Sequence, residues 1–208
     1  MYDVYVITDE GLSNGLSHSE ITKLACEGGA DCIQLRDKNM SREEMIKVAK
    51  EMRRITSLHN VLFIVNDHLD VALESEADGV HLGQSDMSVI DAVKLKGNML
   101  VGISAGSLEE ALAAERGGAD CIGLGPVFHT GSKHDAGKAI GLDLLKEIRS
   151  KVKIPIVAIG GIKKDNAMDV IRSGADGVAV ISAVVSQTDV AEATRELKRI
   201  VDSAKIRA

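Results

Sequence analysis

Short apolar segments and amphipathic segments alternate along the whole chain. Between the apolar segments, residues 41–55 and 107–118 repeat their apolar positions with the period of an α-helix. The apolar segments are rich in Val and Ile and recur at 3–9, 31–37, 61–67, 79–83, 99–105, 121–127, 154–161 and 177–183. This alternation predicts parallel strands joined by helical crossovers.

An Ala-Asp pair recurs just before every second predicted strand. The four copies are GGADCIQL (28–35), SEADGVHL (75–82), GGADCIGL (117–124) and SGADGVAV (173–180). A repeat in every second unit indicates equivalent positions around a closed ring, whereas an open sheet has edges that break such regularity. We therefore predict one (βα)8 TIM barrel over residues 1–208. The repeated aspartates precede strands, on the side opposite the usual active site, so we expect them to be structural.

Composition narrows the classes of function. The net charge of −6, with two Tyr, two Phe and no Trp, argues against nucleic-acid binding. No apolar run is long enough to span a membrane, and MYDVYVITDEG leads straight into a strand, so we expect no secretory signal. Cys26, Cys32 and Cys121 lack metal-site spacing and predict reduced, buried thiols in a cytoplasmic protein. The sequence leaves the oligomeric state open, and a homo-oligomer remains an option.

In this fold the chemistry lies where strands end. Gln34, Arg36 and Lys38 alternate along the end of the second predicted strand and would therefore share one face. Arg and Lys suit phosphate oxygens. The alternative is a salt bridge between these cations and a neighbouring acid.

The next two strands end in polar residues as well. Asn66 and Asp67 follow the third strand, and Asp86 follows the fourth. Neighbouring strands are about 5 Å apart, so both carboxylates could bind one Mg²⁺, whose remaining ligands would be water and substrate phosphates. Alternatively, Asp67 caps the helix HLDVALESE, and Asp86 caps a helix beginning near Met87.

A second anion site is expected after the seventh and eighth strands. Gly160 and Gly161 would let backbone N–H groups approach an anion, and a short helix starting near Ser182 would add more. The loop GPVFHTGSKHDAGKAIG (125–141) is too long for a simple strand-to-helix connection. We interpret it as a polar loop that closes over phosphorylated ligands; the alternative is a solvated insertion.

Together these segments resemble thiamine-phosphate synthase over nearly the whole chain. The matching motifs, in chain order, are YVITD, QLRDK, ND, GQSD, ISA, GLGPVF–T–SK, AIGG and VISA. The family joins hydroxymethylpyrimidine diphosphate to a thiazole phosphate and releases diphosphate. The resemblance thus implies a Mg²⁺-dependent transferase, with one Mg²⁺ per subunit, acting on small phosphorylated substrates.

The resemblance also implies roles for individual residues. Asp67 and Asp86 would bind Mg²⁺, and Arg36, Lys38, Ser104 and Lys133 would be catalytic. The pyrimidine diphosphate would be bound by Gln34, Leu35, Arg36, Asp37, Lys38, Asn66, Ser104 and Lys133. The thiazole phosphate would be bound by Thr130, Gly131, Ser132, Gly161, Ile181 and Ser182.

The chain departs from the family pattern at two places. The family loop usually reads Pro-Thr-x-Thr-Lys, whereas residues 129–133 read His-Thr-Gly-Ser-Lys, which should loosen the loop. Asp37 stands where the family commonly has Glu, and by alternation it should point away from the cavity. The rival functions are a thiazole tautomerase, a non-catalytic phosphate-binding barrel, and another phosphate-binding barrel enzyme such as an aldolase. Retention of the acid pair and of the basic residues argues against all three.

Overall fold

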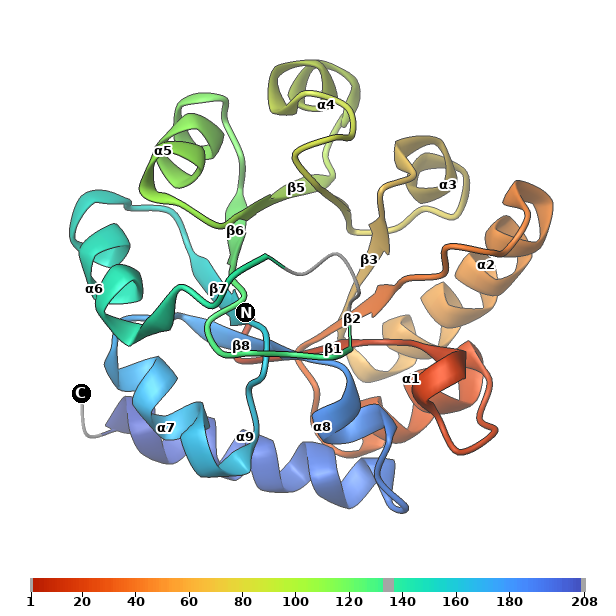
Figure 1. Cartoon of the computed structure of the whole chain (residues 1–208). Helices are drawn as coiled ribbons and strands as arrows, with labels where there is room; N and C mark the ends of the chain where they lie inside the picture. Colours follow the sequence, from red (N-terminus) through yellow and green to blue (C-terminus); the bar gives the residue numbers. More distant parts are fainter. Residues whose placement is uncertain (1, 133–136, 207–208) are drawn as a thin grey trace.

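The structure, a computed structural model, describes residues 2–132 and 137–206 and contains a closed barrel of eight parallel strands (Figure 1). The strands are β1 Val4–Ile7, β2 Cys32–Leu35, β3 Leu62–Asn66, β4 Gly79–Leu82, β5 Leu100–Ala105, β6 Cys121–Leu124, β7 Ile156–Ile159 and β8 Gly177–Val180. The ring closes where β1 pairs with β8, Val4 lying opposite Val178. The predicted TIM barrel is confirmed.

Helices surround the barrel and follow the strands in turn (Figure 1). They are α1 His18–Glu27, α2 Arg42–His59, α3 Leu69–Glu74, α4 Val89–Leu95, α5 Leu108–Arg116, α6 Gly141–Lys151, α7 Lys164–Arg172, α8 Ser182–Val185 and α9 Val190–Ile206, with a short 3-10 helix η1 at Glu10–Leu12. Within the described residues, none of these helices has the length and apolarity needed to cross a bilayer.

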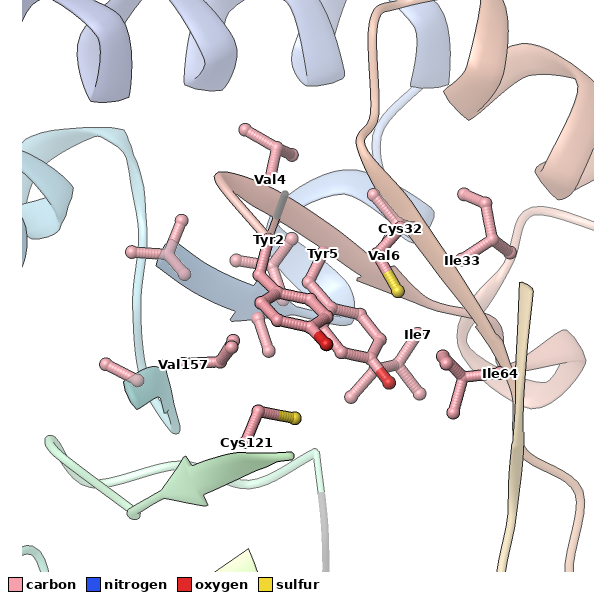
Figure 2. Close-up of a cluster of buried hydrophobic side chains, with 14 of the residues drawn as sticks. Tyr2, Val4, Tyr5, Val6, Ile7, Cys32, Ile33, Ile64, Cys121 and Val157 are labelled. Carbon is pink, nitrogen blue, oxygen red and sulfur yellow. The ribbon is translucent and has the colours of Figure 1, made fainter. Parts of the chain in front are cut away.

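Aromatic and sulfur-containing side chains fill part of the barrel interior (Figure 2). The rings of Tyr2 and Tyr5 stack with their centroids 6.5 Å apart. Cys26, Cys32 and Cys121 are free and buried, as predicted. Burial raises the pKa of the Cys121 thiol to about 12, so this sulfur stays protonated and unreactive.

The four repeated aspartates hold the strands together at their N-terminal ends. Each accepts a hydrogen bond from a backbone N–H at the start of the preceding strand and also pairs with a Lys or Arg. We call each such group an aspartate latch. The latches are Asp31 with Val4 and Lys198, Asp78 with Phe63 and Arg53, Asp120 with Val101 and Lys96, and Asp176 with Ile156 and Arg149.

Candidate active site

Two adjoining cavities lie at the C-terminal ends of the strands. The first, of about 480 Å³, lies over β2 to β6 and is called the acid-base cavity here. The second, of about 420 Å³, lies over β7 and β8 and is called the glycine cavity. Thr130, Ile159 and Gly160 line both, so the two cavities share a wall.

Two cations enter the acid-base cavity from the end of β2. Arg36 and Lys38 both line it. The Arg36 side chain is only 10% exposed, and its Nη1 lies 3.9 Å from Oδ2 of Asp9. The salt bridge considered as the alternative to phosphate binding therefore exists for Arg36, at a distance too long for a strong hydrogen bond. Arg36 still faces the cavity.

Leu35 and Asp37, the other two members of this segment, do not line either of the two cavities in the described part of the chain. Leu35 is buried in the core. The Asp37 carboxylate accepts hydrogen bonds from the backbone of Asn39 and Met40 and lies 3.3 Å from Nε2 of His18. Although burial opposes ionisation, these contacts lower the pKa of Asp37 below its usual value. Asp37 thus shapes the turn after Arg36 while pointing away from the cavity.

Asp67 and Asp86 face each other across the ends of β3 and β4, and both line the acid-base cavity. Neither caps a helix. The N-cap of α3 is His68, and the N-cap of α4 is Ser88, whose side chain accepts a hydrogen bond from Asp91. The capping alternatives are therefore wrong. Instead, Oδ2 of Asp86 accepts a hydrogen bond from Gly83 N at 2.6 Å.

The proximity of the two carboxyls perturbs Asp67. Burial raises its pKa to about 6, together with the hydrogen bond and negative charge of Asp86. A cation bound between the two carboxylates would offset their mutual repulsion. Among the described residues, no group of three or more His, Cys, Asp and Glu could hold a metal. This donor set fits Mg²⁺, which needs only one or two carboxylates when substrate phosphates and water complete its shell.

Ser104 and Gln34 lie deeper, toward the barrel interior. The Oγ of Ser104 is 3.0 Å from Nε2 of His81, and its carbonyl accepts from Gln84 at 2.6 Å. Gln34 is buried and donates to the Tyr5 hydroxyl at 2.8 Å. Gln34 and Ser104 both line a small void of about 30 Å³ beneath the acid-base cavity. Of the two, Ser104 also lines the acid-base cavity.

All six residues predicted for the thiazole phosphate line the glycine cavity, namely Thr130, Gly131, Ser132, Gly161, Ile181 and Ser182. The hydroxyls of Ser132 and Ser182 lie 3.0 Å apart, so the loop after β6 contacts the start of α8. The described part of this loop passes in front of β8 and β1 in Figure 1. The helix predicted to start near Ser182 does start there.

Two consecutive glycines after β7 allow this loop to pack closely. Gly160 and Gly161 have φ of 98° and 64°, a region that glycine adopts readily. A Cβ on Gly160 would lie 2.4 Å from Cβ of Pro126, and one on Gly161 would lie 2.5 Å from the His129 carbonyl oxygen. Lys133, predicted to act from this loop, lies outside the described residues.

Several lining residues were missed in the sequence. They are Leu12, Ile162 and Lys163 in the glycine cavity and Gln84, Ser85 and Pro126 in the acid-base cavity. Ile162 and Ser85 adjoin a predicted residue, and Lys163 and Gln84 lie one position further along, so the position after a strand was the available signal for these four. Leu12 carries no such signal, because η1 brings it to the cavity from the first loop.

The fold and these cavities define a class of protein, a TIM-barrel enzyme that handles phosphorylated small molecules. Residues 4–184 match the family described as thiamine monophosphate synthase. The thiamine-phosphate synthase of Methanocella arvoryzae is 57% identical over 99% of this chain and 97% of its own length. That of Chloroflexus aurantiacus is 52% identical over 99% and 95%.

A solved structure gives the same result. The thiamine phosphate pyrophosphorylase from Pyrococcus furiosus superposes with a TM-score of 0.92 at 48% identity, covering 98% of this chain and 96% of its own. The chain therefore belongs to the thiamine-phosphate synthase family of transferases. The resemblance seen in the sequence motifs is confirmed.

Proposed function

We propose that this protein joins 4-amino-2-methyl-5-(diphosphooxymethyl)pyrimidine to 4-methyl-5-(2-phosphoethyl)thiazole, or to its carboxylate, giving thiamine phosphate and diphosphate. One observation carries the proposal: two differently built cavities share the wall formed by Thr130, Ile159 and Gly160. An enzyme that couples two phosphorylated substrates needs two such cavities in contact.

The acid-base cavity is assigned to the pyrimidine diphosphate. Arg36 and Lys38, which line it, would supply positive charge toward the leaving diphosphate. The family resemblance assigns Lys133 the same task. Gln34, Asn66 and Ser104 orient the pyrimidine ring by hydrogen bonds. Asp67 and Asp86 would hold one Mg²⁺, which when bound neutralises charge on the diphosphate.

The glycine cavity is assigned to the thiazole phosphate. The hydroxyls of Thr130, Ser132 and Ser182, together with backbone at Gly161, offer hydrogen bonds without a second metal ion. Since the cavities share a wall, a thiazole held here can present its ring nitrogen to the pyrimidine.

The reaction needs no protein nucleophile. The bond between the pyrimidine methylene carbon and the diphosphate oxygen breaks, and diphosphate leaves with the electron pair. The amino group of the ring stabilises the resulting cation, and the lone pair of the thiazole nitrogen forms the new C–N bond. Because water would consume the cation, we assign the loop after β6 the additional task of covering the site.

The three free, buried cysteines support a place in the reducing cytoplasm. The Mg²⁺ requirement, the localisation and the substrate assignment are parts of one proposal. The following assay tests the substrate assignment and the Mg²⁺ requirement.

Diphosphate release from the pyrimidine substrate is measured with and without thiazole phosphate, first in Mg²⁺ and then in EDTA. We expect release only with both substrates and metal, with thiamine phosphate as the second product. Absence of release under every condition would refute the assignment. Release that persists in EDTA would refute the metal role of Asp67 and Asp86.

A further inference from the structure

Asn166 lies in the first turn of α7 and contacts the segment that follows β7. Its Oδ1 accepts a hydrogen bond from Lys163 N at 2.8 Å, and its Nδ2 donates to the Gly161 carbonyl at 3.0 Å. The side-chain amide can satisfy both partners in one orientation only, because one partner is a donor and the other an acceptor. One side chain therefore fixes two peptide groups of residues 161–163.

These peptides need an external constraint. Glycines at 160 and 161 have wide conformational freedom, so their own preferences do not fix where their peptide groups point. The Gly160 carbonyl is held by Phe128 N at 3.0 Å, and the Gly161 carbonyl is held by Asn166. Each glycine carbonyl thus has its own anchor, one from the loop after β6 and one from α7.

The anchors determine where the neighbouring N–H groups point. In a trans peptide, the carbonyl and the following N–H point in opposite directions. With the Gly161 carbonyl turned toward Asn166, the Ile162 N–H points away from α7. By the same rule, the Gly161 N–H points away from Phe128 N.

Both N–H groups belong to residues that line the glycine cavity. Among residues 2–132 and 137–206, no acceptor pairs with the N–H of Gly161 or of Ile162. Adjacent unpaired backbone N–H groups at a cavity are donors suited to a phosphate oxygen.

We propose that Asn166 is a positioning residue for phosphate binding: by holding the Gly161 carbonyl it aims the Ile162 N–H into the glycine cavity. The inference rests on the proposed function, since it deepens the assignment of this cavity to the thiazole phosphate. Asn166 acts through the peptide and does not itself touch the substrate.

The test uses two variants that separate this role from helix capping. Asn166→Asp keeps the oxygen that accepts from Lys163 N but places a carboxylate oxygen against the Gly161 carbonyl, which repels it. Asn166→Ala removes both bonds. If Asn166 only capped α7, Asn166→Asp would behave like the wild type.

We expect Asn166→Asp to raise KM for thiazole phosphate about tenfold, the effect of losing one backbone hydrogen bond to a charged group. KM for the pyrimidine diphosphate should stay within about twofold of wild type. The inhibition constant of inorganic phosphate, competing against thiazole phosphate, should rise in parallel. Asn166→Ala should show the same pattern.

The matched control is Glu20→Ala, which removes a similar capping box at the start of α1. It should leave both KM values unchanged. If the wild type turns over normally and Asn166→Asp has an unchanged KM for thiazole phosphate, the inference about Asn166 is overturned while the proposed function stands. If the wild type does not use thiazole phosphate, the proposed function fails. Binding of inorganic phosphate to wild type and Asn166→Asp, measured by calorimetry, then decides the role of Asn166 independently, and equal affinities would overturn it.

Discussion

Asp67 combines two features that are unfavourable in a folded chain. Its φ of 63° lies in the left-handed region, which Asp and Asn tolerate better than most residues. Its pKa of about 6, raised by burial and by Asp86, means that the ionised form is destabilised. Both features fall on a residue proposed to bind Mg²⁺, and such strain typically concentrates at functional sites.

Asp67→Asn should therefore abolish most activity and stabilise the fold. The native carboxyl binds its proton more tightly than the unfolded one. Its contribution to stability is thus favourable at low pH and is lost as pH rises from about 4 to about 6. Above this range Asn removes a destabilising charge, which should raise the free energy of unfolding by about 1 kcal/mol after allowance for solvent screening. Thermal unfolding without metal should show a higher Tm for the variant at pH 7.5, with the difference vanishing near pH 4.

The control for this experiment is Asp67→Ala, which also removes the charge but tolerates the left-handed backbone less well. It should melt below Asp67→Asn at every pH. An Asn variant that melts below wild type at pH 7.5 would contradict the electrostatic account.

For the single residue Asp37, the sequence predicted the direction of the side chain but not its contacts. Alternation along the strand predicted that it points away from Arg36 and Lys38. What it binds instead was not predictable, because His18 comes from α1 and meets Asp37 only in the folded barrel. His18 is 1% exposed and also contacts the Thr8 hydroxyl at 2.7 Å.

At the scale of elements, the loop after β6 depends on the glycines after β7. Phe128 donates to the Gly160 carbonyl, and Pro126 packs where a side chain on Gly160 would be. The shape of the loop near the shared wall is therefore set by a neighbouring strand end as well as by its own sequence.

Gly160→Ala should destabilise the protein by about 3 kcal/mol, combining an unfavourable φ with a steric clash against Pro126. Urea unfolding measures this free energy. Gly131→Ala is the matched control for stability, because nothing lies within 4 Å of its added Cβ and its φ is not positive. A loss of stability equal in the two variants would contradict the packing argument.

The apolar pattern located all eight strands, because each is buried and rich in Val and Ile. It placed their ends too late in several cases; β2 ends at Leu35 and not near Asp37. The start of α4 was misplaced although its signal was present, since Ser88 and Asp91 form a Ser-x-x-Asp pattern. The candidate site was predicted mainly through family motifs, and the anchors of its backbone, such as Asn166, carry no local sequence signal.

At the scale of the whole molecule, stability and chemistry occupy opposite ends of the barrel. The aspartate latches lie at the N-terminal ends of the strands, and both cavities lie at the C-terminal ends. Substitutions in a latch should then change the free energy of unfolding without changing the site.

Asp78→Ala removes the acceptor of Phe63 N and the partner of Arg53. We expect a loss of about 2 kcal/mol, because a strand N–H is left without its acceptor and an ion pair is broken. Arg53→Met is the control that breaks the ion pair alone and should cost less than about 1 kcal/mol. Urea unfolding and steady-state kinetics test this together, and a changed kcat in the folded Asp78→Ala protein would contradict the separation.

The latches also divide the ring in a regular way. Each one links an odd-numbered strand to the even-numbered strand that follows it, from β1 with β2 to β7 with β8. Its cation comes from the helix before the pair, α9 preceding β1 in the ring, except that Lys96 is the residue directly after α4. The barrel is thus assembled from four strand-pair modules. Circular permutants opened between latches, for example at Asn39 between β2 and α2, keep every latch within one continuous stretch of backbone. A permutant opened at Asn60 instead separates Arg53 from Phe63 and Asp78 across the new termini.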